Sequence, residues 1–157
     1  MIRAWRPIKS RYAATAFDGE GARLHGGRWS SPGTLVAYAS DSVALATLEV
    51  LVHLQSTALL ASYSLASLQF PEELVEGLDV SALPRQWRRF PPSPEIQAVG
   101  DRWVSDARSV VLRVPSVIIP TASNFLLNPA RADFEKLTIE PPRPFVFDPR
   151  LLKRTGE

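Results

Sequence analysis

The chain has 157 residues, of which 45% are hydrophobic and 22% charged, so it is predicted to fold as one globular domain with its own core. Its formal net charge of +2 argues against a general nucleic-acid binder, which usually carries a larger and more clustered basic excess. Because it has no cysteine and only two histidines, His25 and His53, disulfides and thiolate chemistry are excluded and no metal site is expected.

The N-terminus and the apolar runs bear on location. Met1–Arg6 carries charges where a signal peptide needs an apolar run. No apolar stretch approaches the roughly 18 residues that a membrane-spanning helix requires. We therefore expect a cytoplasmic protein without a membrane segment.

Hydrophobic periodicity and turn residues predict the elements in chain order. They are a strand over residues 1–8 ended by Pro7, a long functional loop over 14–33, a strand over 35–39, a helix capped by Ser40, Asp41 or Ser42 and running to about 54, a strand over 59–68, an irregular stretch over 71–94, a helix over 95–107, and strands over 110–114, 117–119, 134–139 and 144–147. This order predicts an α+β fold with two or three helices, a single domain over 1–150, and a polar tail over 151–157.

Glu49 is the first candidate for chemistry. It lies at the edge of the apolar arc of its predicted helix, one turn before His53. A partly desolvated carboxylate there can hydrogen-bond a ribose hydroxyl and stabilise the cationic charge that builds when a glycosidic bond breaks. The alternative is an ordinary surface glutamate of an amphipathic helix.

A glycine turn and the following strand supply three further candidates. Arg28 follows two glycines that allow close approach of a ligand, and its guanidinium suits a pyrophosphate. Trp29 can stack on a base or nicotinamide, or pack as a core tryptophan. Tyr38 is either a core residue or a wall beside a bound ring. The alternative for Arg28 is a solvated turn.

Other patterns are weaker. The glycine spacing in residues 19–27 does not fit a dinucleotide fingerprint. A triad of His53 with Ser42 and Asp41 lacks the context of a nucleophile elbow. The segment 85–90 mixes arginines and aromatics as nucleic-acid sites do, but a solvated loop anchored by its tryptophan is the favoured interpretation. In the segment 123–129, Ser123 and Asn124 either satisfy a loop backbone or face the same ligand as Arg28.

Taken together, these segments resemble the RES-domain toxins of bacterial Xre–RES toxin–antitoxin pairs, over nearly the whole chain from about Trp5 to Phe147. The pieces that carry the resemblance are Gly26-Gly27-Arg28-Trp29, Tyr38-Ala39-Ser40, Leu48-Glu49-Val50, Gly100-Asp101-Arg102-Trp103, Val114-Pro115-Ser116 and Asn124-Phe125-Leu126-Leu127-Asn128-Pro129.

The resemblance implies a fold similar to ADP-ribosyltransferases and an activity that consumes NAD⁺ as substrate, by hydrolysis or with inorganic phosphate as co-substrate. By position, it implies that Arg28, Tyr38 and Glu49 form the catalytic core. Arg6 is then a second arginine near the phosphates, with Trp29 and Asn124 as further substrate contacts. The family serine is either Ser116 or Ser123. After its Asn-Pro pair the family often has histidine, where this chain has Ala130-Arg131, and Arg131 is a further candidate for a phosphate contact.

The same resemblance implies a partner, a cognate Xre-type helix-turn-helix antitoxin that covers the cleft, and no direct nucleic-acid binding by this chain. Two other functions stay open at this point. One is transfer of ADP-ribose to a specific host protein, and the other is a non-enzymatic module that binds a nucleotide without turning it over.

Overall fold

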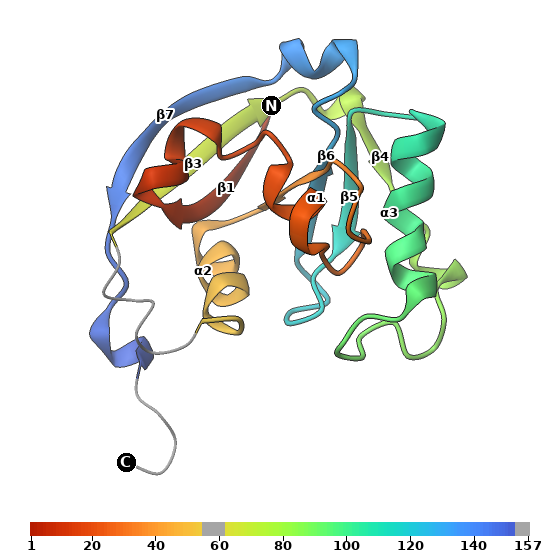
Figure 1. Cartoon of the computed structure of the whole chain (residues 1–157), viewed down its shortest axis with the longest axis horizontal. Coiled ribbons are helices and arrows are strands. Elements are labelled where there is room, and N and C mark those ends of the chain that lie inside the picture. The colour runs from red at the N-terminus through yellow and green to blue at the C-terminus, as the bar shows by residue number, and fades with distance from the viewer. Residues whose placement is uncertain (55–61, 153–157) are drawn as a thin grey trace.

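The computed structural model describes residues 1–54 and 62–152, and its centre is one seven-stranded mixed sheet with the strand order β4-β5-β6-β2-β1-β3-β7 (Figure 1). Neighbouring strands are antiparallel except β4 and β5, which are parallel. The strands are β1 (Ile2–Lys9), β2 (Ala37–Ser40), β3 (Tyr63–Phe70), β4 (Val75–Gly77), β5 (Val111–Pro115), β6 (Ser123–Leu127) and β7 (Thr138–Phe145).

Three α-helices occur in the described part of the chain: α1 (Glu20–His25), α2 (Val43–Leu51) and α3 (Pro94–Asp106). α2 packs against β1, and α1 packs against β2. Figure 1 shows α3 alongside the β4–β5 end of the sheet. Short 3-10 helices connect the elements at Ser10–Thr15, Glu72–Leu74, Val80–Ala82, Ala132–Lys136 and Pro149–Leu152. The predicted α+β class is confirmed, and none of the described helices is long and apolar enough to cross a bilayer.

Strand alternation separates two apolar clusters. Along β6, Phe125 and Leu127 belong to the first cluster, whereas Leu126 belongs to the second, which α3 covers with Ile96 and Trp103. Side chains at successive strand positions point to opposite faces. On β2 and β6, every second side chain therefore points to the same face as the second cluster. The side chains that these two strands contribute to the candidate site lie on this face.

Several sequence predictions are wrong in detail. Pro7 does not end β1, because β2 pairs with β1 only at Trp5 and the strand continues to Lys9 along β3. The predicted loop over 14–33 contains α1, and the irregular stretch over 71–94 contains β4, whose three residues are too few to show a period. Residues 59–61 of the predicted third strand lie outside the described residues, as do 153–157 of the predicted tail.

The second half of the chain brings two more corrections. Residues 117–119 are not a strand, because the Ser116 hydroxyl accepts the backbone N–H groups of Ile118 and Ile119 and turns the chain toward β6. The two predicted final strands form one strand, β7, preceded by a 3-10 helix. Its prolines are tolerated because β7 lies at the edge of the sheet and pairs only with β3.

Candidate active site

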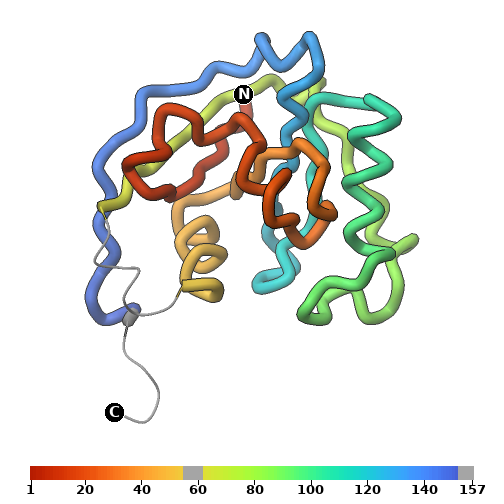
Figure 2. The backbone as a smooth tube through the Cα atoms, viewed as in Figure 1, coloured from red at the N-terminus to blue at the C-terminus, as the bar shows by residue number. Residues whose placement is uncertain are grey.

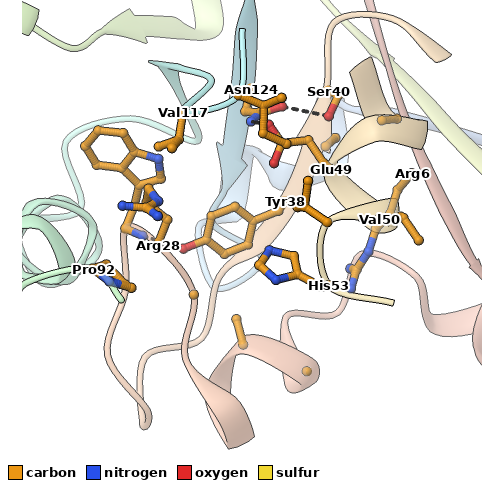
Figure 3. A pocket seen from close by; sticks show the side chains of 18 of the residues that line it. Arg6, Arg28, Tyr38, Ser40, Glu49, Val50, His53, Pro92, Val117 and Asn124 are labelled. Atoms are coloured by element: carbon orange, nitrogen blue, oxygen red, sulfur yellow. Dashed lines mark hydrogen bonds between the residues drawn. The ribbon is translucent and has the colours of Figure 1, made fainter. Parts of the chain in front are cut away.

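A cleft of about 910 Å³ opens between α2, the turn after α1 and the loop that leads into α3, a size typical of small-molecule sites. Figure 3 shows Arg28, Tyr38, Glu49 and His53 around this space. The polar side chains that line the cleft belong to Arg6, His25, Arg28, Tyr38, Ser40, Glu49, His53, Gln97 and Asn124. Six segments separated in the sequence thus meet at one cavity: β1, the turn after α1, β2, α2, α3 and β6.

Glu49 is held by one of its two carboxylate oxygens. The Ser116 hydroxyl and the Asn124 side-chain amide both donate to its Oε1, each at 2.7 Å. Among the described residues, Oε2 has no hydrogen-bond partner. The carboxylate is half-buried at the wall of the cleft, so it is oriented by one oxygen and offers the other to a ligand.

Ser40 fixes the orientation of Asn124. Its buried hydroxyl donates to Asn124 Oδ1 at 2.7 Å, so the amide nitrogen on the other side is the group that meets Glu49. Ser40 and Asn124 are paired across β2 and β6. Our sequence reasoning missed Ser40 as a site residue, although it lies two positions after Tyr38 and therefore on the same face of β2.

The glycines before Arg28 are explained by the turn that they form. Gly26 has φ of 73°, a backbone conformation that favours glycine, and its N–H donates to the Ala22 carbonyl at the end of α1. At Gly27 an added Cβ would lie 2.7 Å from the Tyr38 hydroxyl. Both glycines therefore let the turn close against Tyr38, with Arg28 at its tip.

α3 runs beside this turn (Figure 2), and its side chains hold the turn in place. The Asp101 carboxylate accepts the backbone N–H of Ser31 at 3.0 Å, the Ser31 hydroxyl at 2.5 Å and the Thr34 hydroxyl at 2.7 Å. Gln97 donates to the carbonyls of the turn at Gly27 and Ser30.

Gly100 completes the contact of α3 with the turn. Its backbone N–H donates to the Trp29 carbonyl at 2.9 Å, and a Cβ at this position would lie 2.0 Å from that oxygen. The Gly100-Asp101 pair of the sequence motif is therefore part of the scaffold that positions Arg28.

Arg28 and Arg6 carry positive charge that no carboxylate pairs within the described residues. Arg28 Nη1 donates to the carbonyls of Trp87 and Arg89 at 3.2 and 2.6 Å, and Arg6 Nη1 to the Ala16 carbonyl at 2.6 Å. Burial lowers the pKa of both guanidinium groups, although the charge of Asp18 opposes this at Arg6 and that of Glu49 opposes it at Arg28. Two half-buried arginines bound only to carbonyls form a site that favours an anion.

Tyr38 lines the cleft with a phenol that keeps its proton. Its hydroxyl lies 2.7 Å from the Ser30 hydroxyl and accepts the Trp29 N–H at 3.2 Å. Burial raises the pKa of Tyr38 to about 12. The phenol therefore stays neutral at physiological pH, so it contributes a ring face and a polar edge rather than a base.

The structure gives several predicted residues other roles. Trp29 lines the cleft, but it is only 2% exposed and packs against Trp87 with ring centroids 6.0 Å apart, so its indole is part of the core. Ser116 is 0% exposed and reaches the cleft only through Glu49. Ser123 is not among the described residues that line the cleft, and its N–H donates to Asp41. Ser116 is therefore the serine that the fold brings to the site.

Other candidates resolve in the same way. Arg131 forms an ion pair with Asp133 and donates to the Ala107 carbonyl, so it is committed away from the cleft. Ser42 caps α2 through the Leu45 N–H, so the sequence alternative of a triad with Asp41 and His53 does not form. The described residues contain no group of three or more side chains suited to hold a metal ion.

The arrangement joins two chemical elements. Glu49 offers a fixed carboxylate with a free oxygen, and Arg28 and Arg6 offer unpaired positive charge on opposite sides of the Tyr38 ring (Figure 3). Such a site suits a substrate that has a phosphate group and a sugar carbon at which positive charge develops.

Comparisons with known proteins place the chain in a family. Residues 3–148 match the RES domain. A protein of Photorhabdus laumondii named "Toxin Res" is 39% identical over 95% of this chain and 96% of its own length. A "Prs ADP-ribosylating toxin" of Sphingobium sp. is 35% identical over 91% of both chains. Among solved structures, the M. tuberculosis MbcT-MbcA toxin-antitoxin complex contains a chain of similar fold, with a TM-score of 0.76, 21% identity, and coverage of 96% of this chain and 86% of that one.

Proposed function

The chain belongs to the RES-domain family, and we propose that it is the toxin of a toxin–antitoxin pair that breaks the bond between nicotinamide and ribose in NAD⁺. The observation that carries the proposal is Glu49, a carboxylate at the cleft wall that Ser116 and Asn124 hold by one oxygen. The relatives named as toxins support the biological role.

In the proposed reaction, Arg28 and Arg6 hold the pyrophosphate and Tyr38 lies beside the nicotinamide riboside. The free Oε2 of Glu49 accepts a ribose hydroxyl and stabilises the positive charge on the ribose. The bond from the ribose C1 to the nicotinamide nitrogen breaks, and its electron pair leaves with nicotinamide. Because nicotinamide carries a positive charge before it leaves and is neutral afterwards, its departure needs no general acid.

The acceptor completes the reaction. Water attacking C1 gives ADP-ribose and releases a proton, whereas inorganic phosphate gives ADP-ribose carrying a phosphate at C1. A nucleophilic protein side chain attacks the same carbon in a transferase. Transfer to a specific protein is the second candidate function, because the Sphingobium relative is named as an ADP-ribosylating toxin.

The proposed partner is an Xre-type antitoxin that covers the cleft. The solved structure of similar fold comes from a toxin-antitoxin complex, and the unpaired charge of Arg28 and Arg6 suits a carboxylate or an acidic segment of a partner. A purified complex of the two proteins should bind NAD⁺ far more weakly than the free chain. Equal binding by complex and free chain would contradict occlusion.

The test of the activity is incubation of the purified chain with NAD⁺, with and without inorganic phosphate, followed by mass spectrometry of the products. We expect free nicotinamide together with ADP-ribose or its phosphorylated form. Glu49→Gln should lower turnover by about 10²–10³-fold, the usual cost of removing one group that stabilises charge in the transition state.

The matched control is Glu73→Gln, which changes an exposed glutamate outside the cleft and should leave turnover unchanged. Intact NAD⁺ after incubation with folded wild-type protein would contradict NAD⁺ cleavage. It would then favour ADP-ribosylation of an added acceptor protein or, if NAD⁺ binds without reaction, the non-enzymatic module.

A further inference from the structure

An aromatic pair lies at the mouth of the cleft and has no part in the chemistry described above. His53 follows the C-terminal end of α2, and Phe90 lies on the loop before α3, so they come from opposite walls. Their ring centroids are 6.2 Å apart and the ring planes meet at 45°. The two walls of the cleft therefore touch at this pair.

Core packing does not explain these residues. Phe90 is 73% exposed and His53 is also exposed, yet both line the cleft. A large aromatic side chain left in solvent loses the burial that normally stabilises it. An exposed phenylalanine at the mouth of a binding cleft gains that burial when a flat apolar surface covers it.

The neighbouring residues indicate which part of a nucleotide reaches the pair. Arg28 Nη1 is bound to the carbonyl of Arg89, the residue directly before Phe90. A pyrophosphate held by Arg28 consequently lies next to Phe90. If the ribose that reacts is at Glu49 and beside Tyr38, the other half of the molecule extends from the phosphates toward the mouth.

The pair has to open slightly to admit this occupant. Aromatic rings stack with atoms about 3.5 Å apart, so a ring inserted between two others needs a separation of about 7 Å. The observed 6.2 Å requires the pair to open by roughly 0.8 Å and to rotate toward parallel. Phe90 is free to make this adjustment because most of its side chain contacts solvent.

We propose that His53 and Phe90 clamp the distal purine base of the dinucleotide substrate between their rings. The proposal rests on the proposed function for the identity of the substrate, but the clamp is a binding site that is measurable without turnover. Stacking on aromatic side chains is tolerant of the base that stacks, so the pair selects for the presence of a base rather than for adenine alone.

The first experiment is equilibrium binding of ADP-ribose by calorimetry, because this ligand keeps the base and pyrophosphate and lacks nicotinamide. Phe90→Ala and His53→Ala should each weaken binding by about tenfold, which is within the range measured for one base stacked on one aromatic ring. Phe90→Trp should restore wild-type binding. Tyr12→Ala, an exposed aromatic outside the cleft, is the control and should bind as the wild type does.

Turnover provides the second readout. Nicotinamide mononucleotide has the same glycosidic bond but lacks the purine half. Phe90→Ala should lower kcat/KM for NAD⁺ about tenfold relative to kcat/KM for the mononucleotide. Parallel losses for both substrates would overturn the clamp, since they would place the pair at the nicotinamide end or in general cleft shape.

The two proposals fail separately. A wild-type chain that binds ADP-ribose through Phe90 but leaves NAD⁺ intact would overturn NAD⁺ cleavage and retain the clamp. A wild-type chain that cleaves NAD⁺ while Phe90→Ala binds ADP-ribose unchanged would retain the activity and overturn the clamp. No ADP-ribose binding by the folded wild type would also overturn it.

Discussion

The two walls of the cleft hold their charged residues by different means. Glu49 depends on side chains, since Ser116 and Asn124 both donate to its Oε1 and Ser40 orients Asn124. Arg28 depends on the shape of the glycine turn that carries it, and this turn packs against α3 and is bound there by Asp101 and Gln97. We infer that changes around Glu49 alter activity with little effect on folding, whereas changes around Arg28 alter both.

The largest expected effect is that of Gly100→Ala. The new methyl group would meet the Trp29 carbonyl at 2.0 Å, and a backbone atom in a helix contact cannot move aside as a side chain does. We expect a loss of about 3 kcal/mol in the free energy of unfolding, at the upper end for overpacking, together with a large loss of turnover.

Urea unfolding and NAD⁺ turnover of the same preparation measure both effects. Gly77→Ala is the matched control, because no atom lies within 4 Å of a Cβ added there. If Gly100→Ala kept wild-type stability but lost activity, the distinction between the two walls would be wrong.

Asp101→Asn is expected to have an intermediate effect. Burial opposes ionisation of Asp101, but the hydrogen bonds from Ser31 and Thr34 outweigh it and lower the pKa of the carboxyl group. The substitution removes the charge from these hydrogen bonds and should cost about 1 kcal/mol of stability at pH 7. Turnover should fall with it, because the turn that carries Arg28 loosens.

The lowered pKa of Asp101 also predicts how the stability difference between wild type and Asp101→Asn changes with pH. A carboxyl group with a lowered pKa stabilises the fold above the ordinary carboxyl pKa and ceases to do so as the pH falls through its folded value. The stability difference between wild type and Asp101→Asn should therefore shrink from pH 7 to about pH 3. Asp106→Asn, exposed on the same helix, is the control; a difference independent of pH would refute this role of Asp101.

The smallest expected effect is that of Ser40→Ala. Without the Ser40 hydroxyl, Asn124 no longer has a fixed amide orientation, and its oxygen is free to rotate toward Glu49. We expect kcat to fall about 3- to 10-fold, the equivalent of one neutral hydrogen bond, with KM nearly unchanged. Ser67→Ala, a buried serine on β3, serves as control, and a melting temperature that drops as far as in Gly100→Ala would place Ser40 in the scaffold instead.

The sequence was most informative where local pattern decides structure. The helix that carries Glu49 begins after Ser42, one of the three predicted caps, because a serine before an apolar repeat favours a helix start. The glycines before Arg28 predicted the close approach of a ligand, but the group that approaches Gly27 is the Tyr38 side chain. Local chemistry also predicted that Glu49 lies at the edge of the apolar face of its helix.

Tertiary structure alone decided how these parts combine. Ser116 and Asn124 are 67 and 75 residues from Glu49, and the β2–β6 and β5–β6 registers bring them together. No local pattern distinguishes Ser116 from Ser123, or a stacking Trp29 from a buried one, because each choice depends on which face of the sheet α3 covers. Local sequence thus determined the candidate residues, and long-range strand pairing decided which of them meet in the cleft.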